Sequence, residues 1–349
     1  MLRQLLRLTR PVPAAGPRAR AVAVYADATD RLLIADHRGY EGVACVDDAA
    51  RALVLVCDLW RETHVARLRD WAGGLLDFVL YMQREDGRFQ NFIHDWHGTI
   101  NKDGQTSFAG PTFWQARAVR ALAKAHVLLR DERVALPLAR GLRHAAENEA
   151  PPDVRGIHVL AAIDLMRAGL TPVLRETLDA WCDEIASCRA GDVLLNSPGE
   201  REPHLWGHLQ EGVLAEAGVI LDRPELVAIA RRSAVALVVP QIERGFAQHM
   251  VQPYAVASAV YAMDRLHAAT GEATFATLRD QARAWFDGRN TAGAPAYDRA
   301  SGRVHDGIDD GRLNANSGAE SNIVAAQALL PEVVTRVADM LDELPEAAA

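Results

Sequence analysis

Lysine, long apolar runs and paired cysteines are scarce in this 349-residue chain, and each scarcity excludes a class of protein. Lysine occurs only at Lys102 and Lys124, so 36 of the 38 basic residues are arginines, and 46 acidic residues outnumber them. The net charge of −8, without a basic patch, excludes a strongly basic nucleic-acid binder. No apolar run reaches the ~20 residues that a membrane span needs.

The four cysteines, Cys45, Cys57, Cys182 and Cys188, include no CxxC spacing. We therefore expect free buried thiols and a reducing compartment. Residues 1–20 are basic and partly amphipathic, and arginine and proline interrupt their apolar residues, so no signal-peptide core forms. We expect a cytoplasmic protein in which this N-terminal segment is flexible.

Helical periodicity runs through the chain from about residue 45 onward. It predicts twelve helices, over residues 45–62, 64–84, 112–129, 131–148, 152–169, 171–189, 205–221, 224–241, 253–270, 272–287, 317–330 and 331–343. Links within successive pairs are short and links between pairs are mostly long, so the long loops gather at one rim. The first helix of each pair has few charges and the second is amphipathic, as inner and outer rings require.

This pattern predicts an all-α fold, an (α/α)6 toroid of six helical hairpins with long loops on one rim. We expect one domain over residues 21–345. An open α-solenoid of helical pairs is the alternative, and the irregular pair spacing and the large loops at one end argue against it.

Acidic residues mark the start of the first inner helix. Asp47 and Asp48 fall in its first turn, where the helix dipole stabilises their negative charge. The alternative role is capping, with Asp47 and Arg51 as an i,i+4 ion pair.

A dense polar cluster marks the start of the sixth inner helix. Ser317 and Glu320 have the spacing of a capping box, which would account for Glu320 as a capping residue. Capping does not account for Asn314, Asn316 and Asn322 together.

Closure of the toroid would bring these two helix starts together, with helix axes ~8–10 Å apart. Asp47 or Asp48 would then face the same cavity as Glu320. Carboxylates ~6.5–9.5 Å apart suit an inverting glycosidase, in which one acid protonates the leaving oxygen and one base activates water. Glu211, at the fourth inner helix, is an alternative catalytic partner, and Asp95 is a reserve.

Aromatic residues stand beside amides, carboxylates and histidines in the rim loops. An aromatic ring can stack on the C–H face of a pyranose while polar groups bind its hydroxyls; the alternatives are a buried hairpin and satisfied core histidines. The candidate substrate-binding residues are Tyr40, Asn91, Asp95, Trp96, Trp114, His204, Trp206, His208, His249, Tyr254, Asn314 and Asn316.

Two short motifs invite a metal interpretation. The pair His204 and His208 lacks an HExxH motif or a cysteine partner. The run Asp309-Asp310-Gly311 lacks the EF-hand spacing and its terminal glutamate. We expect no metal and no cofactor.

The chain resembles the six-hairpin glycosidase superfamily, and more closely the bacterial (α/α)6 domains associated with glycosyltransferases, over roughly residues 40–330. The resemblance lies in the segments GYEGVACVDDAARALVLV, YMQREDGRFQNFI, PTFWQARAVRALAKA and NANSGAESNIVAAQALL. The shared stretches map onto Cys45, Asp47, Asp48, Ala50 and Arg51, onto 86–89 and Asn91, and onto Asn316, Gly318, Ala319, Glu320 and Ser321. The superfamily includes hydrolases, phosphorylases, lyases and epimerases, so the resemblance implies glycan chemistry.

The sequence therefore predicts a carbohydrate-active enzyme, an inverting glycoside hydrolase acting on an oligosaccharide or glycoconjugate. One alternative is a non-catalytic glycan-binding or scaffold module. Another is a uronate lyase or epimerase, in which Tyr40, Tyr254 or His249 would act beside rim arginines that neutralise the uronate.

Overall fold

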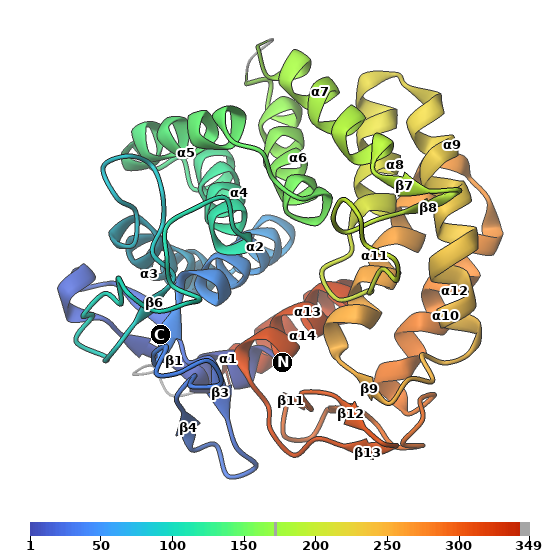
Figure 1. Cartoon of the computed structure of the whole chain (residues 1–349). Coiled ribbons are helices and arrows are strands. Elements are labelled where there is room, and N and C mark those ends of the chain that lie inside the picture. The colour runs from blue at the N-terminus through green and yellow to red at the C-terminus, as the bar shows by residue number, and fades with distance from the viewer. Residues whose placement is uncertain (171–172, 343–349) are drawn as a thin grey trace. The chain divides into compact units, whose positions relative to one another are not determined.

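The computed structural model describes residues 1–170 and 173–342, and the chain's contacts divide into two compact units. Unit 1 comprises residues 1–149, 299–304 and 315 onward, and unit 2 comprises residues 150–298 and 305–314. Each unit consists of helical hairpins whose connections carry short strands (Figure 1).

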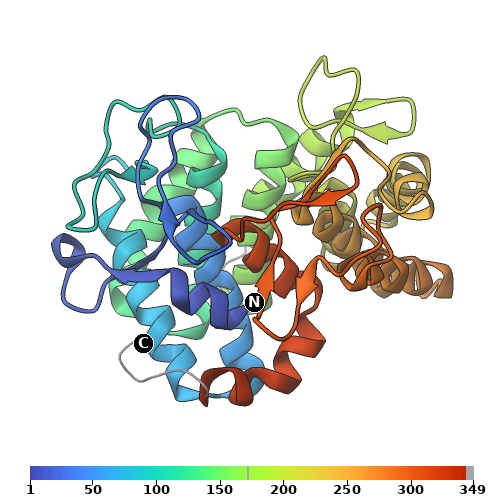
Figure 2. The same cartoon turned by 90° about the horizontal axis from the view of Figure 1, so that it is seen from below.

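In unit 1 a single helix, α2, contacts most of the others. The helices of this unit are α1 (Leu2–Leu8), α2 (Val46–Thr63), α3 (Ala66–Tyr81), α4 (Phe113–Leu128), α5 (Ala135–Glu147), α13 (Ala319–Ala328) and α14 (Leu330–Asp342), with short 3-10 turns η1 (Pro13–Ala15) and η2 (Glu132–Val134). α3, α4, α13 and α14 all pack against α2, so alanine, valine and leucine are buried on most of its faces. Figure 2 shows α1 beside the red helices of the same unit.

The two helices of a hairpin differ in burial. α4 buries ten of its 16 residues, whereas its partner α5 buries three of 13. This agrees with the expectation that the first helix of a pair is apolar on most faces and the second is amphipathic.

Unit 2 repeats the hairpin arrangement. Its helices are α6 (Pro152–Arg167), α7 (Val173–Ser187), α8 (Gln210–Leu221), α9 (Pro224–Ser233), the π-helical η3 (Ala234–Val238), α10 (Val239–Glu243), α11 (Pro253–Thr270), α12 (Ala273–Arg283) and the 3-10 turn η4 (Ala284–Asp287). α8 packs against α6, α9 and α11, and α12 packs on α11. Pro240 lacks the amide hydrogen that a regular α-helix would use, and the π-helical stretch lies just before it.

The strands are short and lie in the loops. In unit 1, β1 (Thr9–Pro11) pairs with β2 (Arg20–Val22), β3 (Tyr25–Ala26) with β4 (Leu32–Leu33), and β5 (Ala44–Cys45) with β6 (Phe92–Ile93), all antiparallel. β11 (Arg303–Val304) also belongs to unit 1. In unit 2, β7 (Arg189–Ala190) pairs with β8 (Val193–Leu194), β12 (Ile308–Asp309) lies between β9 (Met250–Val251) and β13 (Arg312–Leu313), and β10 (Tyr297–Asp298) completes the set.

All twelve expected helices are present, and the fourth, eighth and tenth include short 3-10 or π-helical turns. The largest boundary difference is at the seventh, which begins at Gln210 and not near residue 205. The expected start at residue 171 and the expected end at residue 343 lie outside the described residues. Among the helices that the structure describes, none combines the length and the apolar character of a membrane span.

The N-terminal segment differs from the expectation of a flexible stretch over residues 1–20. It folds into α1, β1, η1 and β2, and Leu2, Leu5 and Leu8 are buried. The reason is that α1 presents leucines to α13 and α14, helices that follow more than 300 residues later in the chain. The single domain predicted over 21–345 stays a prediction.

Candidate active site

Five charged side chains meet where α2 begins, all within unit 1. Arg51 donates from Nη2 to Asp48 Oδ1 at 2.6 Å and from Nη1 to Glu320 Oε1 at 2.8 Å. Arg117, from α4, donates to Asp47 Oδ2, and this oxygen also lies 3.7 Å from Arg51 Nη2. We call Asp47, Asp48, Arg51, Arg117 and Glu320 the Arg51 cluster.

Local structure fixes the first turn of α2. Cys45 pairs with Phe92 across β5 and β6, and the strand runs directly into the helix. Cys45 is also the N-cap of α2, because its Sγ accepts a hydrogen bond from the Asp48 amide at 3.4 Å. Asn91 Oδ1 accepts from the Asp47 amide at 3.2 Å. The cap of α2 is therefore a cysteine, which leaves both aspartates available for the cluster.

The capping box expected from Ser317 and Glu320 is wrong. α13 begins at Ala319, its N-cap Gly318 makes no side-chain hydrogen bond, and Ser317 Oγ accepts from Asn322 Nδ2 at 3.0 Å. Glu320 instead pairs with Arg51 across the contact between α13 and α2. That contact confirms that the first and sixth helices of the expected inner set are neighbours.

The three carboxylates differ in what their oxygens contact. Asp48 is 3% exposed, and its second oxygen lies 3.2 Å from Cys45 Sγ, so protein groups hold both oxygens. Asp47 is 18% exposed, and its Oδ1 is buried without a hydrogen-bond partner. Glu320 is 45% exposed, and among the described residues only Arg51 binds it, through Oε1. Asp47 and Glu320 thus each keep one oxygen without a protein partner.

Burial and neighbouring charges set the protonation of the two aspartates in opposite directions. Burial raises the pKa of Asp48 to about 6, and the negative charges of Asp47 and Glu320 add to the rise against the opposing effect of Arg51. Burial also opposes ionisation of Asp47, but Arg117 and Arg51 outweigh it, so the pKa of Asp47 lies below its usual value. Burial raises the pKa of the Cys45 thiol well above its usual range, so this thiol stays protonated.

An aromatic pair involves Trp114, a residue of the same helix as Arg117. Phe108 and Trp114 pack edge to face with ring centroids 5.3 Å apart, and Trp114 Nε1 donates to the Phe108 carbonyl at 3.1 Å. Phe108 is 49% exposed. Trp114 and Arg117 are three residues apart on α4, so they share a helix face that leads to Asp47. Sequence reasoning missed Phe108, because nothing local distinguishes it from a core residue.

The other predicted rim residues of unit 1 have separate roles. Tyr40 is half exposed and stacks on His94 with centroids 5.6 Å apart. Asn91 is buried between the Asp47 amide and the Thr106 carbonyl, so it holds the loop. Asp95 caps a turn, where hydrogen bonds from the Thr99 side chain and backbone hold its pKa below the usual value. Trp96 and Asn316 are half-buried.

In unit 2 a second polar cluster surrounds His208. Its Nδ1 bonds Asn196 Oδ1, and its Nε2 lies 2.9 and 2.8 Å from the two oxygens of Glu211. Ser233 donates to Glu211 Oε1 at 2.6 Å and accepts from the Leu194 amide at 2.9 Å. We call Asn196, His208, Glu211 and Ser233 the His208 cluster.

The His208 cluster is sealed from solvent. The side chains of His208 and Glu211 are both 0% exposed. Burial opposes ionisation of Glu211, but His208 and the hydrogen bond from Ser233 outweigh it, so the pKa of Glu211 lies below its usual value. Both ring nitrogens of His208 contact protein groups, so neither can reach a substrate in this structure.

The remaining predicted residues of unit 2 are scattered. Trp206 is 45% exposed and stacks flat on His204, with centroids 4.0 Å apart. His249 is exposed and pairs with Asp310. Tyr254 is buried at the start of α11. Asn314 donates to Asp309 at 3.1 Å and accepts from His305 through its carbonyl.

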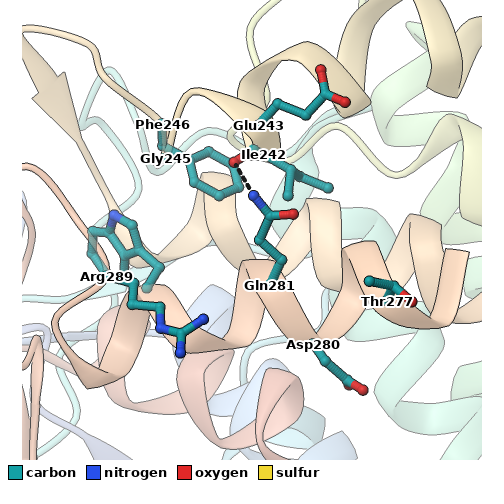
Figure 3. Close-up of a pocket in the computed structure, with 9 residues that line it drawn as sticks. Ile242, Glu243, Gly245, Phe246, Thr277, Asp280, Gln281 and Arg289 are labelled. Carbon is teal, nitrogen blue, oxygen red and sulfur yellow. Dashed lines mark hydrogen bonds between the residues drawn. The ribbon is translucent and has the colours of Figure 1, made fainter. Parts of the chain in front are cut away.

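A cavity of about 460 Å³ lies elsewhere in unit 2, between α10, α12 and η4 (Figure 3). Ile242, Phe246 and Trp285 form part of its lining, and Gln281 donates to the Ile242 carbonyl at 3.4 Å. Its lining includes none of the site residues predicted from the sequence, all of which the structure describes. Within the same described ranges, no three acidic, histidine or cysteine side chains are grouped as a metal site.

Comparison with known proteins identifies the fold. No family model matches the chain, and no curated protein matches it. Among solved structures, it is similar to a sugar epimerase from a ruminal bacterium, with a TM-score of 0.71 and 12% identity, covering 96% of this chain and 99% of that one. It is also similar to a cellobiose 2-epimerase from Spirochaeta thermophila, with a TM-score of 0.71 and 13% identity, covering 97% of this chain and 94% of that one.

A family 76 glycoside hydrolase from a bovine Bacteroides thetaiotaomicron strain is also similar, with a TM-score of 0.65 and 10% identity, covering 94% of this chain and 75% of that one. These structures share the (α/α)6 fold. The chain therefore has the (α/α)6 fold, as the sequence predicted, and the resemblance to the six-hairpin glycosidases is confirmed at the level of the fold.

Proposed function

We propose that this chain is a carbohydrate-active enzyme whose reaction takes place at the Arg51 cluster, and that the reaction is glycoside hydrolysis with inversion. One observation carries the proposal. Asp47 and Glu320 are each anchored to Arg51 through one oxygen, while the other oxygen has no protein partner among the described residues. Two carboxylates so arranged can serve as base and acid for one water and one glycosidic bond.

Asp47 is the base in this proposal. Its lowered pKa keeps it ionised, and its buried Oδ1, which has no hydrogen-bond partner, would accept a proton from a water molecule that enters with the substrate. The water oxygen forms its bond to the anomeric carbon as that proton leaves. Arg117 and Arg51 hold the other oxygen, which fixes the direction of attack.

Glu320 is the acid, because it is the most exposed carboxylate of the cluster. It gives its proton to the glycosidic oxygen as the bond to the anomeric carbon breaks, and exchange with solvent resets both carboxylates. Asp48 has the raised pKa that suits an acid, but its oxygens are occupied by Arg51 and Cys45. Accessibility therefore favours Glu320.

The Arg51 guanidinium stands between the two reacting carboxylates. This supports inversion, since retaining enzymes bring their carboxylates to ~5–5.5 Å and leave no room for water between them. Arg51 and Arg117 already pair with carboxylates of the cluster, which favours a neutral sugar over a uronate as the substrate. Phe108 and Trp114 would stack on the sugar, and so would Tyr40, which precedes Asp47 by seven residues in the sequence.

The test is release of reducing sugar from a panel of plant and bacterial oligosaccharides, with time-resolved NMR of the first product anomer. We expect hydrolysis with inverted configuration, lost in Asp47→Asn and in Glu320→Gln. Retained configuration, or full activity in either folded variant, would contradict the proposal. Sugar binding by calorimetry without release would favour the non-catalytic module.

A sugar epimerase or isomerase is the second candidate, and a specific observation favours it. The epimerase structures have TM-scores of 0.71 against 0.65 for the family 76 hydrolase, and they match almost over their whole length. Such an enzyme exchanges the C2 hydrogen of a free sugar with solvent. Incubation with mannose or cellobiose in D₂O, followed by NMR at C2, separates the two functions: exchange without hydrolysis supports the epimerase.

A further inference from the structure

Asp48 is the one carboxylate of the Arg51 cluster that a substrate cannot reach. It is 3% exposed, its Oδ1 lies 2.6 Å from Arg51 Nη2, and its Oδ2 lies 3.2 Å from Cys45 Sγ. The proposed reaction leaves it without a role, although it shares Arg51 with both reacting carboxylates.

Its contact with Arg51 controls where the guanidinium points. The guanidinium is planar and rigid, so fixing Nη2 fixes the direction of Nη1 as well. Nη1 is the atom that binds Glu320, at 2.8 Å, and Nη2 lies 3.7 Å from Asp47. The shortest of these distances is the one to Asp48. Asp48 is therefore the anchor from which Arg51 reaches both reacting carboxylates.

Cys45 in turn holds Asp48. Its Sγ contacts the carboxylate at 3.2 Å and accepts from the Asp48 amide at 3.4 Å, so it binds side chain and backbone together. Both residues are buried. A thiol is a weak donor and a weak acceptor, so it can keep the contact in either protonation state of the acid. Asp47 and Glu320 supply negative charge that acts on Asp48, and Arg51 supplies positive charge that opposes it.

We propose that Asp48 and Cys45 are positioning residues that hold Arg51 between Asp47 and Glu320 and do not themselves touch the substrate. This inference rests on the proposed function. The Cys-x-Asp-Asp-x-x-Arg run of residues 45–51 then works as one unit. Cys45 caps the helix, Asp47 is the base, and Asp48 anchors Arg51 against the reacting carboxylates.

The first test needs no substrate. The carboxyl carbons of aspartate are labelled with ¹³C and titrated by NMR, and the Asp48 resonance is identified by its loss in Asp48→Asn. We expect one aspartate with a midpoint near 6 in the wild type. Cys45→Ala removes a donor to the carboxylate and raises that midpoint, whereas Cys45→Ser keeps a donor and restores it. An unchanged midpoint in Cys45→Ala would overturn the role of Cys45.

The second test uses hydrolysis of whichever oligosaccharide the wild type cleaves. Asp48→Asn is expected to lower kcat by up to about 100-fold with little change in KM, since misplaced reacting groups lose transition-state geometry. The matched control is Asp58→Asn on the same helix, which removes ion pairs to Lys124 and Arg61, both at 3.2 Å, away from the cluster. The control is expected to keep kcat.

The outcomes are distinguishable. Equal kcat in Asp48→Asn and Asp58→Asn would overturn the anchor role of Asp48. A rise in KM alone would place Asp48 in contact with substrate and contradict the inference. No hydrolysis by the wild type contradicts the proposed function, and the NMR titration then still decides whether Cys45 and Asp48 are coupled.

Discussion

The Arg51 cluster of unit 1 and the His208 cluster of unit 2 contain the same kinds of group but use them differently. Both place a carboxylate beside a nitrogen-bearing side chain near the start of a buried helix, an arginine in one and a histidine in the other. In the His208 cluster the acid and its histidine are 0% exposed and face only protein. In the Arg51 cluster Glu320 is 45% exposed and Asp47 is 18% exposed.

The difference shows how to separate a structural polar network from a reactive one. A fully buried network such as the His208 cluster fixes how its helices pack, and removing one partner leaves a costly unpaired group. A network with a solvent-exposed carboxylate, such as Glu320, presents that group to water or substrate. Mutation of the first kind of network should lower stability, and mutation of the second kind should lower activity.

The largest expected effect is on activity, from Asp47→Asn. Loss of the base should lower kcat by about 10²- to 10⁴-fold while the protein stays folded. Added azide, a nucleophile that needs no base, should restore turnover and give a glycosyl azide of inverted configuration. Failure of azide to restore any turnover would count against Asp47 as the base.

The next effect is on stability, from Glu211→Gln. Breaking a buried pair costs about 3–5 kcal/mol, so the free energy of unfolding measured in urea should fall by that amount. Activity per folded molecule should match the wild type. A large loss of activity at unchanged stability would move the reactive site to the His208 cluster.

The pH dependence of stability should also separate the clusters. The pKa of Asp48 is raised from 3.8 to about 6, so the folded state holds a proton that the unfolded state releases. Stability therefore falls as pH rises from about 4 to about 6, by roughly 2–3 kcal/mol. Asp48→Asn should flatten this window in urea unfolding series. Glu211, with its lowered pKa, acts oppositely and loses its contribution as pH falls.

The smallest effect is expected from Ser233→Ala. It leaves the Leu194 amide and one Glu211 oxygen without their hydroxyl partner, which costs about 1–2 kcal/mol. Differential scanning calorimetry would measure it, with activity at low temperature unchanged. A stability loss below the error of the measurement would show that water replaces the hydroxyl.

Helix periodicity predicted the fold because each hairpin is decided locally, by which residues a helix must bury. It also brought Asp47, Asp48 and Glu320 together, because ring closure makes the first and sixth inner helices neighbours. It missed Arg117 and assigned Arg51 only to a local pair, since their partners lie 70 and 269 residues away. It also placed Glu211 and His208 at the rim, because helix starts in the sequence do not reveal which are covered.

The central claim is that Glu320 donates a proton to the leaving group, and leaving-group dependence in Glu320→Gln tests it most directly. The variant and the wild type are compared on an oligosaccharide and on its dinitrophenyl glycoside, whose leaving group needs no protonation. We predict that the variant loses hydrolysis of the oligosaccharide and keeps near wild-type cleavage of the dinitrophenyl glycoside. Equal losses on both substrates would contradict it.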